Sequence, residues 1–195
     1  MRFQVSSFKI LISYPALAVI TLIVLSNVYT NYLLCLTAVL IHETGHLIPM
    51  FLFALKPEAL EIRAFNIKII AKARYNTNFF RDFIITASGA LFNLFAFLFF
   101  FRINIDLAYV NLFIALFNLL PASSLDGGQL IFLALSRAFS RKTTARIIDI
   151  ITIITALPIF FFGILILIYS KYNFSLLIIG IYLVLSLFFR EEKYL

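Results

Sequence analysis

The 195-residue chain is 63% hydrophobic and only 13% charged. A soluble domain is about 45–50% apolar and about 25% charged. A single core in a chain of this size cannot enclose so many additional apolar residues. The composition therefore excludes a soluble globular protein. The formal net charge of +7 does not indicate nucleic-acid binding, because most basic residues lie in the gaps between apolar stretches. Cys35 is the only cysteine, which excludes a disulfide framework and a cysteine metal cluster.

Apolar stretches of about 20 residues cross a bilayer as helices, and the sequence contains six candidates. They lie at about 8–26, 32–55, 83–101, 107–139, 147–168 and 174–189. The first is predicted to be a retained span rather than a cleaved signal peptide, because it is long and lacks a cleavage-site pattern. We therefore expect an all-α polytopic membrane protein, with residues 1–195 forming a single six-span core.

The fourth stretch is predicted to be broken. Its length of about 33 residues is too great for one straight span, and Pro121, Gly127 and Gly128 interrupt it. Proline and glycine break helices, and irregular backbone at membrane depth persists only when it is buried in protein or lines a wet cavity. We expect a helix to about Leu119, a non-helical elbow, and a second helix from about Gly127 to residue 139.

Residues 60–74, between the second and third spans, alternate apolar and charged side chains. Alternation with a period of two is typical of strands. It predicts a small β-hairpin at the membrane surface that turns near Phe65 and Asn66. The alternation alone leaves open whether this hairpin serves a function or only connects two spans.

The basic residues indicate the orientation in the membrane. Six spans place both termini on one side, and if that side is the cytoplasm, only Arg102 and Lys171 lie outside. An excess of Lys and Arg in cytoplasmic loops is the usual determinant of topology. The sequence thus predicts a multi-pass protein of the cell membrane with cytoplasmic termini.

The two histidines of the chain form one motif within the second span. They are His42 and His46, with Glu43 after the first, which makes the pattern H-E-x-x-H. Residues four apart share a helix face, so both imidazoles can hold one zinc ion while the glutamate acts as general base. Ionisable groups inside a membrane segment are costly and usually mark a function. Gly45 is expected to leave room for a neighbouring helix.

A catalytic zinc site takes three protein ligands, and no third histidine exists. The missing ligand should therefore be an acid. Asp126 lies in the predicted elbow, where a proline and two glycines would let the backbone bring a carboxylate to a metal; capping the following helix is a compatible role. Glu61, in the predicted hairpin, is the rival ligand, whereas Asp82 and Asp106 are predicted to be helix N-caps.

These motifs resemble the site-2 protease family of intramembrane zinc metalloproteases. Besides H-E-x-x-H, the pattern N-x-x-P-x-x-x-L-D-G is matched by Asn118, Pro121, Leu125, Asp126 and Gly127. The family pattern Gly-Pro-x-x-Asn is matched in part, since Gly89 and Asn93 are kept and Ala90 replaces the proline. The stage IV sporulation protein FB subtype is the nearest in pattern, although we expect neither its CBS domain nor a PDZ domain here.

The resemblance implies an endopeptidase that cleaves transmembrane or membrane-associated proteins, in regulated intramembrane proteolysis, with pro-sigma-factor processing in sporulation as the role that the nearest subtype suggests. It implies one zinc ion held by His42, His46 and Asp126, with Glu43 as general base. Asn118 and Asn93 are the amides expected to stabilise an oxyanion or hold substrate, although polar residues in spans also join helices. The resemblance further suggests that interfacial strands pair with unwound substrate.

Two alternatives use the same residues. A metal-binding or transport protein would exchange metal without proteolysis, and a silent membrane protein would need no general base.

His46 lies about nine residues before the inner end of its span, or about 14 Å along a helix, so we expect an active site nearer the cytoplasmic face. The expected partners are a membrane protein substrate and the lipid bilayer, and regulatory membrane partners or a homo-oligomer are left open.

Overall fold

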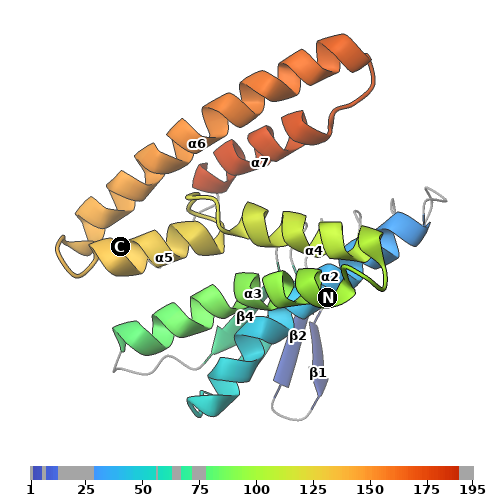
Figure 1. The fold of residues 1–195 in the computed structure, drawn as a ribbon. Coiled ribbons are helices and arrows are strands. Elements are labelled where there is room, and N and C mark those ends of the chain that lie inside the picture. Colours follow the sequence, from blue (N-terminus) through green and yellow to red (C-terminus); the bar gives the residue numbers. More distant parts are fainter. Residues whose placement is uncertain are drawn as a thin grey trace. The chain divides into compact units, whose positions relative to one another are not determined.

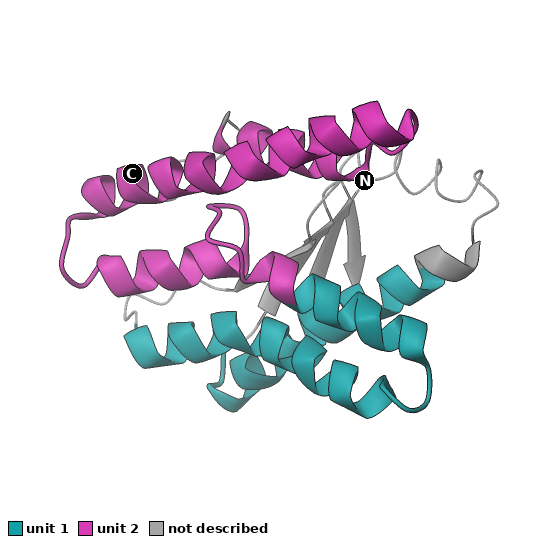
Figure 2. Cartoon of the chain, turned by 45° about the horizontal axis from the view of Figure 1, so that its top comes forward, with its two compact units in different colours: residues 1–115 teal, residues 116–195 magenta. Residues whose placement is uncertain are grey.

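The computed structural model describes residues 2–5, 8–12, 29–55, 57–62, 67–71 and 78–188. The chain forms two compact units, residues 1–115 and residues 116–195 (Figure 2). Figure 1 shows the described elements, which in chain order are β1 (Arg2–Val5), β2 (Phe8–Ile12), α2 (Tyr29–Leu52), β3 (Pro57–Ile62), β4 (Ile67–Ala71), α3 (Phe79–Phe100), α4 (Ile105–Asn118), α5 (Asp126–Leu135), α6 (Arg141–Ser170) and α7 (Ser175–Phe188).

The helices coincide with five of the six predicted stretches. Within the described residues, α2, α3 and α6 are long and apolar enough to cross a membrane, and α4, α5 and α7 are shorter apolar helices. Large apolar side chains lie on their outer faces; Phe95 and Leu98 of α3, for example, are each 68% exposed. Continuous apolar surface of this kind is stable in lipid and not in water, so these are the helices of an integral membrane protein.

The sheet corrects the expected fold class. Four strands are ordered β1-β2-β3-β4; β3 and β4 pair antiparallel as the predicted hairpin, with Ile62 opposite Ile67. Strands β1 and β2 were not expected, because residues 8–12 were assigned to the first span. Strand β2 pairs in parallel with β3, a distant partner that an apolar run does not reveal. The rest of that predicted span, residues 13–28, lies outside the described residues.

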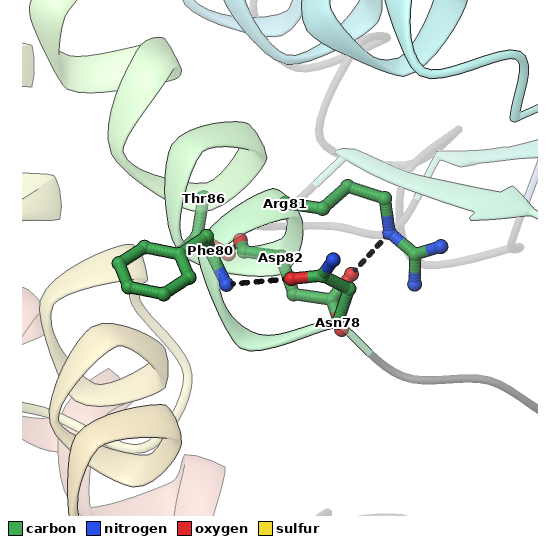
Figure 3. A network of polar contacts seen from close by, with 5 residues as sticks. All are labelled: Asn78, Phe80, Arg81, Asp82 and Thr86. Atoms are coloured by element: carbon green, nitrogen blue, oxygen red, sulfur yellow. Dashed lines mark hydrogen bonds and ion pairs between the residues drawn. The ribbon is translucent and has the colours of Figure 1, made fainter.

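Helix α3 begins at a polar cap, shown in Figure 3. The side chain of Asn78 accepts a hydrogen bond from the backbone N–H of Phe80 at 3.1 Å. Asp82, the predicted cap, lies inside the first turn instead, where its carboxylate accepts from Arg81 Nε at 2.9 Å and its carbonyl accepts from Thr86 Oγ1 at 2.9 Å. The prediction for Asp82 was wrong because an asparagine just before the helix satisfies the same orphan N–H groups.

The same correction applies to α4. Asn104, rather than Asp106, accepts the hydrogen bond from the backbone N–H of Leu107, at 3.0 Å. Helix α4 packs against α3, with the rings of Tyr109 and Phe97 6.2 Å apart. Two asparagine caps thus begin the two helices that complete the first unit.

The second unit contains the break predicted for the fourth stretch. Helix α4 ends at Asn118 and α5 begins at Asp126, so the expected elbow between them is confirmed. Helices α6 and α7 lie side by side (Figure 1). A small core holds the elbow against these two helices, and its buried members are Ala122, Leu125, Ala156 and Leu183.

Candidate metal centre

The two histidines face each other one turn apart on α2, as their spacing predicts. Their ring centroids are 4.8 Å apart with an interplanar angle of 88°, and the two Nε2 atoms are 3.3 Å apart. His42 is only 5% exposed. With Zn–N bonds of about 2.0–2.1 Å, two tetrahedral ligand nitrogens lie about 3.3 Å apart, so this pair has the spacing of two zinc ligands.

Hydrogen bonds on the far side of each ring determine which nitrogen carries the hydrogen. His42 Nδ1 lies 2.7 Å from Asn93 Oδ1, and His46 Nδ1 lies 2.7 Å from the backbone carbonyl oxygen of Ile85. Both partners are acceptors, so each Nδ1 donates. In the neutral rings both Nε2 atoms then present lone pairs to each other, an arrangement that a cation between them stabilises. The donor set therefore fits a metal ion.

Two glycines allow α2 and α3 to approach closely at this point. A Cβ atom on Gly45 would lie 2.8 Å from the carbonyl oxygen of Ser88, which confirms that Gly45 leaves room for a neighbouring helix. A Cβ on Gly89 would collide with Nε2 of His46 and lie 2.9 Å from Cε1 of His42. Gly89 therefore keeps open the space beside both imidazoles.

Asp126 is the first residue of α5, and it is partly buried. The N-cap is Leu125, whose side chain makes no capping hydrogen bond, so the alternative role of Asp126 as the cap is wrong. A Cβ on Gly127 would collide with the carbonyl oxygen of Leu119, and one on Gly128 with that of Ala122. The two glycines thus let the elbow fold back onto the start of α5.

His42 and His46 in the first unit and Asp126 in the second can each offer one ligand atom to a metal ion. Glu43 follows the first histidine on α2 and is partly buried, and Asn118 is the last residue of α4 and also partly buried. Glu61, the rival acid, lies in strand β3 opposite Lys68. The first unit thus carries a candidate two-histidine metal site with an adjacent carboxylate, and Asp126 in the second unit stays the predicted third ligand.

A buried hydroxyl holds the elbow to α6. The backbone N–H of Ser123 donates to Thr152 Oγ1 at 2.9 Å, and this hydroxyl donates to the carbonyl of Ile148 at 2.8 Å. We expect Thr152→Val, which keeps the volume but removes the acceptor, to destabilise the protein by about 1–3 kcal/mol.

Thermal unfolding in detergent measures this effect. Thr155→Val is the matched control, because Thr155 bonds the carbonyl of Ile151 within the same helix, and its Tm should change much less. Equal shifts in the two variants would contradict the role of Thr152 in holding the elbow.

Residues 93–162 match the family model of peptidase family M50. The matched segment contains the Asn118 to Asp126 pattern, and the two histidines precede it on α2. The chain is similar in fold to the site-2 protease from Methanocaldococcus jannaschii, with a TM-score of 0.69, 21% sequence identity, and coverage of 99% of this chain and 96% of that one. No curated protein matches the chain in sequence.

Two groups that hold the histidine pair in place were missed in the sequence. The Ile85 carbonyl is a backbone group that every residue has, so the sequence does not indicate its role. Asn111 is fully buried in α4 and bonds Asn93. A signal for Asn111 existed, since an asparagine within an apolar stretch needs a partner.

Proposed function

We propose that this chain is an intramembrane zinc endopeptidase, similar to peptidase family M50, that hydrolyses peptide bonds of transmembrane or membrane-associated proteins. The observation that carries the proposal is the pair of imidazoles on an apolar helix, each held through Nδ1 so that both Nε2 atoms are directed toward one point. A purely structural pair of buried histidines would gain nothing from opposing lone pairs at 3.3 Å.

The protein residues divide the chemistry among them. Zinc, when bound, polarises the scissile carbonyl and lowers the pKa of water towards about 7. His42, His46 and Asp126 would hold the ion, and two neutral imidazoles with one carboxylate leave it a net positive charge. Glu43 would take a proton from the attacking water and return it to the leaving amine. The amide of Asn118 would donate to the developing oxyanion.

The surroundings of the site suit a membrane substrate. We propose that the protein lies in the cell membrane with both termini cytoplasmic, so that the site is nearer the cytoplasmic face and water reaches it from that side. This orientation rests on the distribution of Lys and Arg between the apolar stretches. Strand β4 ends the described sheet, and an extended substrate segment could add to such an edge through main-chain hydrogen bonds.

Reconstitution with a transmembrane reporter substrate tests the proposal. The wild type should bind one zinc per chain and cleave the reporter. Asp126→Asn should reduce zinc affinity by more than the about 10–100-fold typical of outer contacts to a metal ligand, and cleavage should fall with it. Asp106→Asn, which alters an exposed acid in the first turn of α4, is the matched control and should retain both properties.

Zinc bound to vesicles and zinc carried into them are measured in parallel. Full cleavage by the Asp126→Asn variant would refute Asp126 as a ligand. Zinc transport by the wild type with no cleavage of any reporter would instead establish the metal-transport alternative, in which Glu43 is dispensable.

A further inference from the structure

A chain of buried amides extends from His42 across α3 to α4. His42 Nδ1 donates to Asn93 Oδ1 at 2.7 Å. Asn93 Nδ2 in turn donates to the carbonyl of Ala38 at 2.9 Å and to Asn111 Oδ1 at 2.8 Å, and Asn111 Nδ2 donates to the carbonyl of Leu107 at 2.8 Å. Both asparagines are 0% exposed, so water does not compete for these groups.

The direction of every hydrogen bond in this chain is fixed by two backbone carbonyls. The carbonyl oxygens of Ala38 and Leu107 only accept, so the NH2 groups of both asparagines must face them. Asn111 Oδ1 is then left to face Asn93, and Asn93 Oδ1 to face His42. If the Asn93 amide were reversed, its oxygen would oppose two other oxygens in a dry environment, at a cost of about 1–3 kcal/mol for each buried group left unsatisfied.

We propose that Asn111 is a positioning residue of the metal centre. Through Asn93 it holds His42 in the tautomer with the hydrogen on Nδ1, which presents the Nε2 lone pair to the metal. The proposal rests on the proposed role of His42 as a metal ligand. It also gives Asn93 a role other than the oxyanion contact expected from the sequence, because both amide hydrogens of Asn93 are donated within the protein.

The other histidine provides an internal comparison. His46 is held by the backbone carbonyl of Ile85, which no side-chain substitution in α4 removes. Changing Asn111 should therefore affect the tautomer of His42 and leave that of His46 unchanged. Because the chain contains only these two histidines, a histidine-labelled sample reports on both rings and on nothing else.

The test combines nitrogen NMR of 15N-histidine-labelled protein, metal-free and at a pH where both rings are neutral, with zinc affinity measured against a competing chelator. In the wild type both rings should show the Nδ1–H tautomer. Asn111→Leu, which removes both polar groups at similar volume, should give a tautomer mixture for His42 alone. Its zinc affinity should fall about 10–100-fold, the usual effect of losing an outer contact.

Two further variants separate positioning from general destabilisation. Asn111→Asp keeps an acceptor oxygen toward Asn93 and should restore the wild-type tautomer of His42. Asn104→Leu removes the cap of the same helix and should lower stability without changing either ring. If Asn111→Leu does not fold, Asn111→Ala provides the same comparison.

Two negative results would contradict two different proposals. Retention of the pure Nδ1–H tautomer and of full zinc affinity when the Asn111 amide is removed would overturn the role of Asn111. A wild type that binds no zinc would instead overturn the proposed function, and the tautomers of its metal-free form would still show whether the amide chain orients His42.

Discussion

Replacing Gly89 by alanine should eliminate zinc binding while the helices remain folded. The three atoms nearest to a Cβ at this position all belong to the rings of His42 and His46, and one of them is Nε2 of His46. Neither ring can turn away without breaking the hydrogen bond at its Nδ1. The methyl group would therefore occupy the space beside the metal-facing nitrogens, and we expect zinc affinity to fall by more than the about 100-fold upper range for outer contacts.

A competition titration with a chelator measures this loss, and helicity measured by circular dichroism checks the fold. Gly180→Ala is the matched control, because its added methyl would lie 3.0 Å from Cα of Phe160, between α7 and α6. It should weaken helix packing and leave zinc affinity unchanged. Wild-type affinity in Gly89→Ala would show that the metal does not lie between the two imidazoles.

Glu43→Gln should separate metal binding from catalysis. Glutamine has nearly the same shape as glutamate but cannot take a proton from water, so zinc affinity should stay within a few-fold of the wild type. Loss of a general base typically costs about 10²–10⁴-fold in rate, and cleavage of the reporter should fall by at least that range. The single-turnover cleavage rate at full zinc occupancy is the measurement.

The matched control for Glu43→Gln is again Asp106→Asn, which removes an acid elsewhere in the chain and should cleave at the wild-type rate. If zinc-loaded Glu43→Gln cleaves as fast as the wild type, Glu43 is not the base. If it loses zinc as well as activity, Glu43 contributes to the ligand set and the assignment of Asp126 must be reconsidered.

Local patterns predicted the parts of the molecule that depend on near neighbours. The pairing of His42 with His46 follows from helix geometry alone, and the elbow follows from the inability of proline and glycine to continue a helix. The hairpin of β3 and β4 follows from a period of two. Helix caps are also local, and Asn78 and Asn104 could have been preferred to the acids that follow them, since asparagine is among the strongest capping residues.

The remaining features depend on contacts between distant segments. Strand β2 forms because β3 offers it a parallel partner, and its apolar residues would suit a membrane helix equally well. The contact of Gly89 with both histidines and the hydrogen bond from His42 to Asn93 both require the crossing of α2 and α3. A sequence shows which residues need partners, and the fold determines which partners they obtain.

We propose that one zinc ion, held by His42, His46 and Asp126, is required for peptide hydrolysis within the membrane. Titrating zinc into metal-free wild-type protein, reconstituted with the transmembrane reporter, tests it most directly. Cleavage should be absent without metal, rise in proportion to bound zinc, and reach its maximum at one zinc per chain. Cleavage by the metal-free protein, or a rate independent of zinc occupancy, would contradict the claim.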